Sequence, residues 1–267
     1  MIKRVLSKLQ DIAYATGYGA LNGAAMLLPS MRGRRRCNMC GKEAALFYRH
    51  GEKSPVFSQV RIVGGGVRTN SVCPNCHCID RYRWVYYVIE HFTDIMTAPC
   101  KVLHIAAEAG VARNIRGRNP QCDYLTGDLQ SRHADIKVDV TDMSRFEDET
   151  FDYIIMNHVL EHVPDEAKAI SEIKRCLKKD GRAMLSFPLC LDQKTFEDKS
   201  IVSEKERLIR YGQRDHCRLY GYDAGERLER YGFKVTAYTA GKCLDAKDVE
   251  KMGLIAQDTI YLCAKAD

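Results

Sequence analysis

The stretch Phe151–Pro188 restricts the fold of this chain more than any other, because it reads as strand, loop, helix, glycine turn and strand. Tyr153–Met156 is a short apolar run typical of a strand that is buried on both faces. Asp165 is placed to cap a helix, and apolar residues recur at helical spacing from Ala169 to Leu177. Gly181 is expected to end that helix with a positive φ angle before a further apolar strand. The stretch predicts a βαβ unit of a largely parallel α/β sheet.

Apolar segments on both sides of this unit extend the predicted sheet. The last two flank a long connection, and we expect the final strand to run antiparallel to its neighbours. The segments interpreted as strands are residues 101–106, 123–128, 136–142, 233–239 and 258–264.

Four of the twelve cysteines form two CxxC pairs, Cys37 with Cys40 and Cys73 with Cys76, separated by residues 41–72. Four thiolates on two tight turns are the ligand set of a tetrahedral structural zinc site. A unit this short buries little apolar surface, so a metal ion would contribute much of its stability. Paired reduced cysteines without metal are the alternative interpretation.

The motif FDxxxxxxVLEHVPD, with the charged helix and DGR turn that follow it, resembles the second half of class I S-adenosylmethionine-dependent methyltransferases. The resemblance covers residues 100–264 and implies a Rossmann-like, seven-stranded, mostly parallel sheet. The order CxxC, CPxC, an arginine-rich helix, VLHIA and YGQxDHxRLYG is similar to bacterial methyltransferases with an amino-terminal zinc module. We therefore expect a basic helix and linker over residues 1–36, a zinc module over 37–80 and a methyltransferase domain over 81–267.

The loop after the first sheet strand, VLHIAAEAG, stands where this family has its glycine-rich cofactor loop. His104 occupies the position of the usual acid, and Ala106 and Glu108 occupy glycine positions. Small side chains permit close approach of a ligand to the backbone. The resemblance implies that these residues bind the methionine part of S-adenosylmethionine, with Glu108 accepting from its ammonium group.

Polar residues at the ends of later strands complete the expected cofactor site. Asp128 ends the second strand, where a carboxylate can accept from both ribose hydroxyls of a nucleoside. The resemblance implies that Asp139 accepts from the adenine amino group and that Val140 packs on the ring. Asn157 and His158 follow the fourth strand and are expected to lie beside the sulfonium.

The polar segment around His216 is the strongest candidate for acting on the methyl acceptor. His216 is expected to accept a proton from a hydroxyl, with Asp215 orienting its ring. Arg214 and Arg218 are expected to hold an anionic substrate. His162 is a second candidate base. A polar loop without a catalytic role is the alternative for this segment, and an architectural role is the alternative for the LEHV stretch.

The expected reaction is transfer of a methyl group from S-adenosylmethionine to an oxygen of a sugar, a surface glycan or a small molecule. One alternative is methylation of ribosomal RNA, although the zinc module lacks the dense basic and aromatic stripe of a nucleic-acid surface. Another is a non-catalytic binding protein whose cofactor loop is degenerate. Binding of cofactor would separate the last alternative from the first two.

The net charge of +6 is concentrated in residues 1–36. Such a segment can contact phosphates or an anionic membrane surface through residues 1–30, or it can be a solvated tail. No stretch reaches the roughly 20 consecutive apolar residues of a membrane span. Scattered cysteines suit a reducing compartment. We therefore expect a cytoplasmic protein, with a peripheral membrane location as the alternative.

Overall fold

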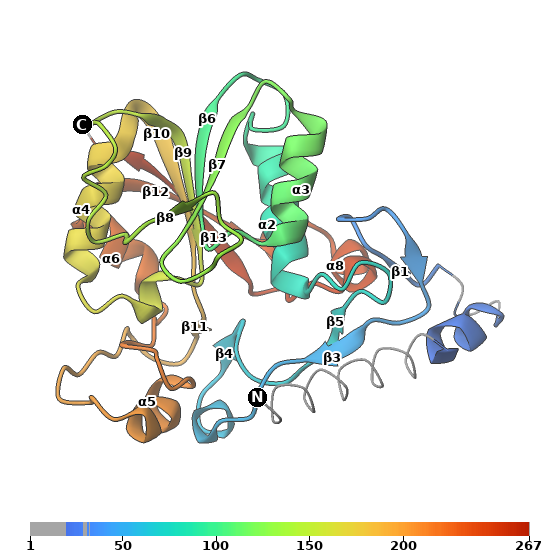
Figure 1. The fold of residues 1–267 in the computed structure, drawn as a ribbon. Coiled ribbons are helices and arrows are strands. Elements are labelled where there is room, and N and C mark those ends of the chain that lie inside the picture. The colour runs from blue at the N-terminus through green and yellow to red at the C-terminus, as the bar shows by residue number, and fades with distance from the viewer. Residues whose placement is uncertain (1–19, 29–30, 32, 267) are drawn as a thin grey trace.

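The structure is a computed structural model that describes residues 20–28, 31 and 33–266. Its centre is a seven-stranded sheet in the order β12-β13-β10-β9-β6-β7-β8 (Figure 1). β13 pairs antiparallel with both β10 and β12, whereas the pairs from β10 to β8 are parallel. This confirms the predicted mostly parallel sheet with an antiparallel last strand. The strands are β6 (Lys101–Ile105), β7 (Asp123–Asp128), β8 (Ile136–Lys137), β9 (Phe151–Asn157), β10 (Leu177–Ser186), β12 (Phe233–Thr239) and β13 (Thr259–Lys265).

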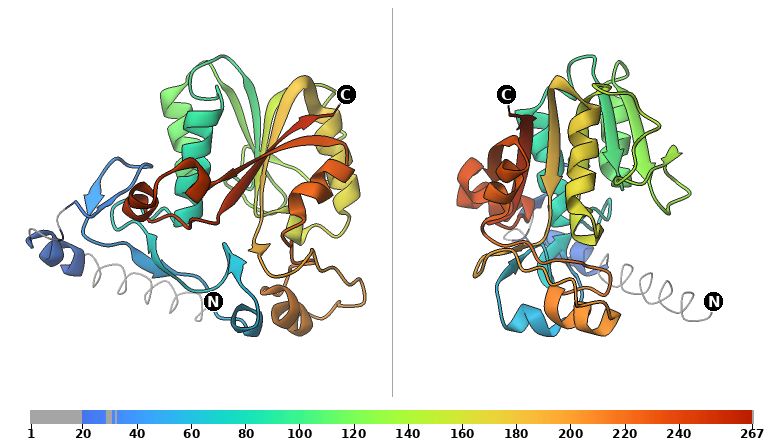
Figure 2. Two further views of the ribbon diagram at one scale, coloured as in Figure 1. Left: turned by 180° about the vertical axis from the view of Figure 1, so that it is seen from behind. Right: turned by 90° about the vertical axis from the view of Figure 1, so that its left-hand side faces the viewer.

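Helices cover both faces of the sheet, as Figures 1 and 2 show. Along β9, Ile154 and Met156 pack into a core that includes residues of α4 and α6, whereas Tyr153 and Ile155 pack into a second core with α2 and α3. This alternation follows from the two-residue period of a strand and explains why the run is apolar throughout. The helices are α2 (Asp80–Phe92), α3 (Ala109–Arg118), α4 (Glu166–Cys176), α5 (Glu204–Tyr211), α6 (Ala224–Arg230), α7 (Ala240–Cys243) and α8 (Ala246–Met252).

The amino-terminal part joins the sheet through a shared core and a short strand pair. Cys37, Phe47 and Cys73 pack in the same core as Trp84 of α2 and Ile155 of β9. β11, which follows β10, pairs antiparallel with β4 of the amino-terminal part. This pairing brings the amino-terminal part against the carboxyl end of β10. The elements are β1 (Arg35–Arg36), β2 (Glu43–Ala44), β3 (Tyr48–His50), η1 (Pro55–Ser58), β4 (Ile62–Val63), β5 (Arg68–Val72) and β11 (Leu189–Cys190).

The central βαβ unit forms as predicted at its start but not at its turn. The Asp165 side chain accepts from the Lys168 backbone N–H, so it caps α4 as expected. The prediction that Gly181 ends the helix with a positive φ was wrong. The helix ends at Cys176, and Gly181 lies within β10 without a positive φ. A glycine is required there because an added Cβ would lie 2.8 Å from the carbonyl oxygen of Phe151.

Of the predicted membrane-contacting segment 1–30, the structure describes only residues 20–28, of which 20–26 are helical. The contact stays a prediction. Among the described residues, no helix is both long enough and apolar enough to cross a membrane.

Candidate active site

The loop between β6 and α3 has the backbone shape of a glycine loop without its glycines. Ala106 has a φ of +51°, in the left-handed region that usually favours glycine. Its N–H donates to the carbonyl of Gly127 at the end of β7. Such a turn exposes backbone directly beyond the carboxyl end of β6, where α/β sheets bind ligands.

This loop forms one wall of a cavity of about 670 Å³, and the cysteine turns form the opposite wall. The residues lining it include Met39, Cys40, Cys76, His77, Tyr82, Ala106, Ala107, Glu108, Ala109, Gly110, Arg113 and Asn114.

Glu108 is the polar centre of that wall, and His104 lies behind it. Glu108 is buried, with an exposed side-chain fraction of only 6%. His104 is fully buried, with Nδ1 2.6 Å from the Tyr124 hydroxyl and Nε2 3.0 Å from Glu108 Oε2. The predicted direct contact of His104 with a cofactor is therefore blocked by burial, whereas Glu108 faces the cavity.

The predicted nucleoside residues separate into one that lines a cavity and two that do not. Asp128 lines a second cavity of about 370 Å³ with Thr126 and Ala107. Its Oδ1 accepts from two backbone N–H groups of the following turn. Asp139 is exposed and accepts from Thr141, and Val140 packs into the core. The latter two line neither of these cavities.

Asn157 and His158 lie at the carboxyl end of β9. Asn157 is buried, its Oδ1 accepts from the Ser186 hydroxyl at 3.0 Å, and its Nδ2 has no partner among the described residues. His158 has a φ of +54°, and its Nδ1 lies 3.4 Å from Glu161 Oε1. An added Cβ at Gly64 would lie 3.2 Å from the His158 ring, so the amino-terminal part closes over this histidine.

Three residues, Glu161, His162 and His216, come together beyond this point. Each offers one potential ligand atom, and these atoms lie within 4.8 Å of one another. The rings of His162 and His216 meet edge to face with centroids 4.6 Å apart. The predicted orientation of His216 by Asp215 was wrong, because Asp215 Oδ2 lies 3.0 Å from His162 Nδ1 instead. Asp215 and His216 are adjacent in the chain, but the Asp215 side chain points to solvent and is 70% exposed, whereas His216 is only 2% exposed.

Burial controls the ionisation of this cluster. It raises the pKa of Glu161 to about 8. It also lowers the pKa of His216 to about 4, helped by the nearby His162. Burial lowers the pKa of His158, and the charge of Arg81 adds to this effect. Burial also lowers the pKa of His162, although the neighbouring Asp215 carboxylate acts in the opposite direction. Burial therefore disfavours the charged form of each imidazole.

The predicted substrate arginines have different surroundings. Arg214 is exposed. Arg218 is buried and donates to the backbone carbonyls of Leu160, Val163 and Pro164 as well as to Glu197. Because both terminal nitrogens donate to the protein and the side chain is buried, Arg218 holds the 160–164 loop in place, which argues against its expected contact with substrate.

Sequence reasoning assigned no role to Glu161 or Tyr82, although both lie at the site. Glu161 directly follows the apolar pair Val159–Leu160, and an acid beside such a pair is a signal of a buried carboxyl. Tyr82 lines the larger cavity, and the Arg81 guanidinium lies 5.5 Å from its ring centroid. The charge of Arg81 also acts on His158, where it adds to the lowering of the pKa by burial.

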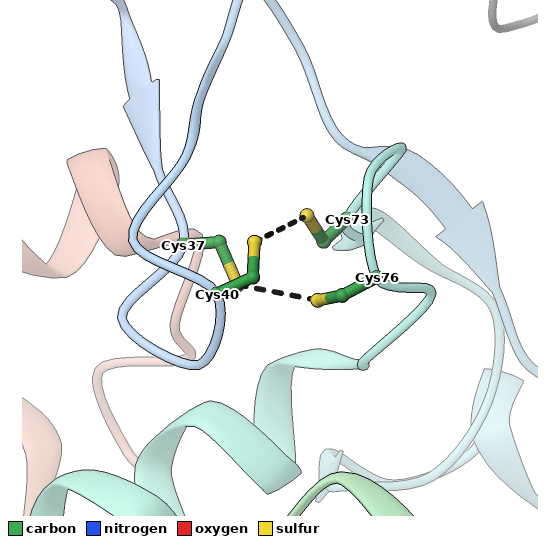
Figure 3. Close-up of side chains that lie close together, drawn as sticks. All are labelled: Cys37, Cys40, Cys73 and Cys76. Atoms are coloured by element: carbon green, nitrogen blue, oxygen red, sulfur yellow. Dashed lines mark hydrogen bonds between the residues drawn. The ribbon is translucent and has the colours of Figure 1, made fainter. Parts of the chain in front are cut away.

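The four predicted metal ligands converge, as Figure 3 shows. Cys37, Cys40, Cys73 and Cys76 lie with their sulfur atoms within 4.8 Å of one another. The Sγ atoms of Cys37 and Cys76 are 3.6 Å apart, and those of Cys40 and Cys73 are 3.9 Å apart. The fifth thiol, that of Cys78, lies 3.3 Å from Cys37 Sγ.

Comparison with known proteins identifies the family. Residues 50–238 match the protein family described as Methyltransferase domain. The chain is 33% identical over 89 residues to an uncharacterized protein of Methanocaldococcus jannaschii, over 33% of this chain and 41% of that protein. It is 30% identical over 89 residues to phosphoethanolamine N-methyltransferase 2 of Caenorhabditis elegans, over 31% of this chain and 20% of that protein. The chain thus matches less than half the length of either relative.

Among solved structures, a SAM-dependent methyltransferase from Archaeoglobus fulgidus is similar, with a TM-score of 0.45 and 13% identity. The similarity covers 68% of this chain and 93% of that one. The family match spans most of the chain, which belongs to the methyltransferase-domain family.

Proposed function

We propose that the protein transfers a methyl group from S-adenosylmethionine to an oxygen of a sugar, a glycan or a small molecule. The main support for this proposal is the wall that Ala106 and Glu108 form in the cavity of about 670 Å³. Its backbone has the turned shape of a cofactor loop, and the buried Glu108 carboxylate, which lies against His104, faces the cavity. A buried carboxylate in a cavity wall suits a ligand that carries an ammonium group.

The surrounding residues fit S-adenosylmethionine. Glu108 would accept from its ammonium group, and Ala107 and Gly110 leave room for its methionine part. Asp128 would accept from the ribose hydroxyls. His104 would act indirectly, because its ring is fully buried and lies against Glu108. We keep Asp139 and Val140 as the proposed adenine contacts.

The acceptor side of the site would be formed by His158, His162 and His216. When bound, S-adenosylmethionine supplies an electrophilic methyl group on its sulfonium. The chain has to position the acceptor oxygen for in-line displacement and to assist loss of its proton. We assign that assistance to His162 and His216, with Asp215 as the positioning residue for His162. Arg214 stays the proposed contact for an anionic part of the substrate.

We also propose a structural zinc ion on Cys37, Cys40, Cys73 and Cys76, within a module over residues 37–80. Four thiolates at about 2.3 Å from a tetrahedral zinc ion would have sulfur–sulfur distances of about 3.8 Å. The distances of 3.6 and 3.9 Å across the site fit this expectation. All twelve cysteines are free, which supports a cytoplasmic location.

Methyl transfer from S-adenosyl-[methyl-³H]methionine into fractionated lysate tests the acceptor class. We expect label in the polysaccharide or small-molecule fraction, and about a hundredfold less label with the His216→Gln variant. His91→Gln changes a half-exposed histidine on α2 and is the matched control. Label confined to RNA would contradict an oxygen of a sugar or small molecule and would favour ribosomal RNA.

A further inference from the structure

The cluster of Glu161, His162 and His216 has more in common with a metal centre than with a lone general base. Glu161 and His162 belong to η2 (Leu160–His162), whereas His216 follows α5. Two imidazoles and one carboxylate converge from these two segments with potential ligand atoms within 4.8 Å of one another. This is the donor set that three-ligand sites use for divalent transition metals, with further positions left for water or substrate.

The second nitrogen of each imidazole is already held in the way that metal-binding histidines require. His162 Nδ1 lies 3.0 Å from Asp215 Oδ2. His216 Nδ1 lies 3.3 Å from the carbonyl oxygen of Tyr211. Because a carbonyl or a carboxylate accepts, each Nδ1 carries the proton and each Nε2 keeps its lone pair. His216 Nε2 is buried and has no hydrogen-bond partner among the described residues. Partners of this kind fix the tautomer and orientation of metal ligands.

Glu161 supplies the independent second observation. Its side chain is 1% exposed, and His158 Nδ1 lies 3.4 Å from its Oε1, but neither carboxylate oxygen makes a hydrogen bond to another described residue. A buried carboxylate without hydrogen bonds is costly unless a cation compensates it. The backbone on both sides is fixed, since Arg218 donates to the carbonyls of Leu160 and Val163 and the Cys217 N–H donates to the Glu161 carbonyl.

We propose that Glu161, His162 and His216 bind one divalent transition-metal cation, distinct from the four-cysteine site. The two imidazoles favour iron(II), nickel, copper or zinc over magnesium and calcium, and the carboxylate of Glu161 also suits manganese. Its catalytic role rests on the proposed methyl transfer. There His162 and His216 would assist proton loss by holding the cation rather than by accepting the proton, and the cation would coordinate the acceptor oxygen and lower the pKa of its hydroxyl. The hydroxyl proton would leave to solvent, the oxygen–methyl bond would form, and the sulfonium–methyl bond would break with its electron pair returning to sulfur.

Manganese(II) is the probe for this site, because thiolates bind it poorly and the four-cysteine site would not compete. Protein purified with its four-cysteine zinc site filled is titrated with Mn²⁺, and the free ion is counted by electron paramagnetic resonance. We expect one bound Mn²⁺ per chain, with binding weakened at least tenfold in Glu161→Gln and in His216→Gln. Asp215→Asn, an exposed change, should weaken binding about tenfold by releasing the His162 ring.

His91→Gln should bind Mn²⁺ as the unmodified protein does, and near-ultraviolet circular dichroism checks that each variant is folded. Absence of a bound Mn²⁺ in the unmodified protein would overturn the proposal. So would unchanged affinity in folded Glu161→Gln. The titration needs no S-adenosylmethionine, so its failure would leave methyl transfer in place, and a failure of cofactor binding would leave the metal site in place.

Discussion

Asp215 Oδ2 lies 3.0 Å from His162 Nδ1, which links the segment after α5 to the loop after β9. The two residues are far apart in the chain, yet their pairing fixes the direction of the imidazole at the proposed acceptor site. Asp215 is 70% exposed, so the pair contributes little to the stability of the fold. We expect the pair to orient the His162 imidazole rather than to stabilise the fold.

Asp215→Asn is therefore expected to separate activity from stability. An amide can present its NH₂ group to His162 and favour the wrong tautomer, which should lower the rate of methyl transfer about ten- to a hundredfold. The free energy of unfolding, measured with denaturant, should change by less than about 1 kcal/mol, because the pair is exposed. Equal losses of stability and activity would show that Asp215 serves the fold alone.

If the four cysteines bind zinc, replacing one of them should lower the stability of the protein far more than replacing a cysteine outside the cluster. Cys40→Ser removes one ligand and should lower the free energy of unfolding by several kcal/mol, measured by urea denaturation. Cys243→Ser changes a partly buried cysteine outside the cluster and should cost less than about 1 kcal/mol. Metal analysis should find zinc in the unmodified protein, and a preparation free of zinc but equally stable would contradict the assignment.

The positive φ of Ala106 predicts backbone strain in the loop between β6 and α3. A non-glycine residue with a φ of +51° costs about 1 kcal/mol, so Ala106→Gly should raise the free energy of unfolding by about 0.5 kcal/mol after the entropy of the unfolded glycine is subtracted. Ala112→Gly, the same change inside α3, should instead lower it by about 1 kcal/mol. Similar losses in both variants would mean that position 106 is not strained.

Asp258 predicts a pH dependence of folding. Burial, and then the like charge of Asp80, raise the pKa of Asp258 to about 7. The unfolded side chain ionises near pH 3.9, so between about pH 4 and 7 the unfolded state binds fewer protons than the folded state. Stability therefore falls as the pH rises through this window, by up to about 4 kcal/mol, and levels off above pH 7.

Asp258→Asn removes this titration. The free energy of unfolding of the variant minus that of the unmodified protein should rise between pH 4 and 7 and then stay constant. Contributions from other groups cancel in this difference. A difference that does not vary with pH would contradict a raised pKa at Asp258.

Much of the fold could be predicted because its signals are local. Residues 123–128 and 233–239 form strands within the predicted bounds, since the apolar pattern of each strand lies within its own segment. The predicted strand over residues 136–142 is shorter than expected and covers only Ile136–Lys137. The Asp139 side chain accepts from the Thr141 N–H in a turn that follows it.

The site was harder to predict because its contacts join distant segments. Adjacent acid and histidine at 215 and 216 suggested a pair, but their side chains point to different environments. Arg218 was expected at the substrate because it is charged, yet carbonyls of the 160–164 loop bind it. His162, which pairs with Asp215, and the carbonyls that bind Arg218 lie some fifty or more residues earlier in the chain. No local sequence pattern indicates these contacts.

The central claim is that this chain binds S-adenosylmethionine through the loop after β6, and isothermal titration of the folded, metal-replete protein tests it most directly. We predict saturable binding of one molecule per chain, weakened about tenfold or more in Glu108→Gln because a charged hydrogen bond is lost. The exposed Glu147→Gln control should bind normally. No binding by the folded, unmodified protein would contradict the account.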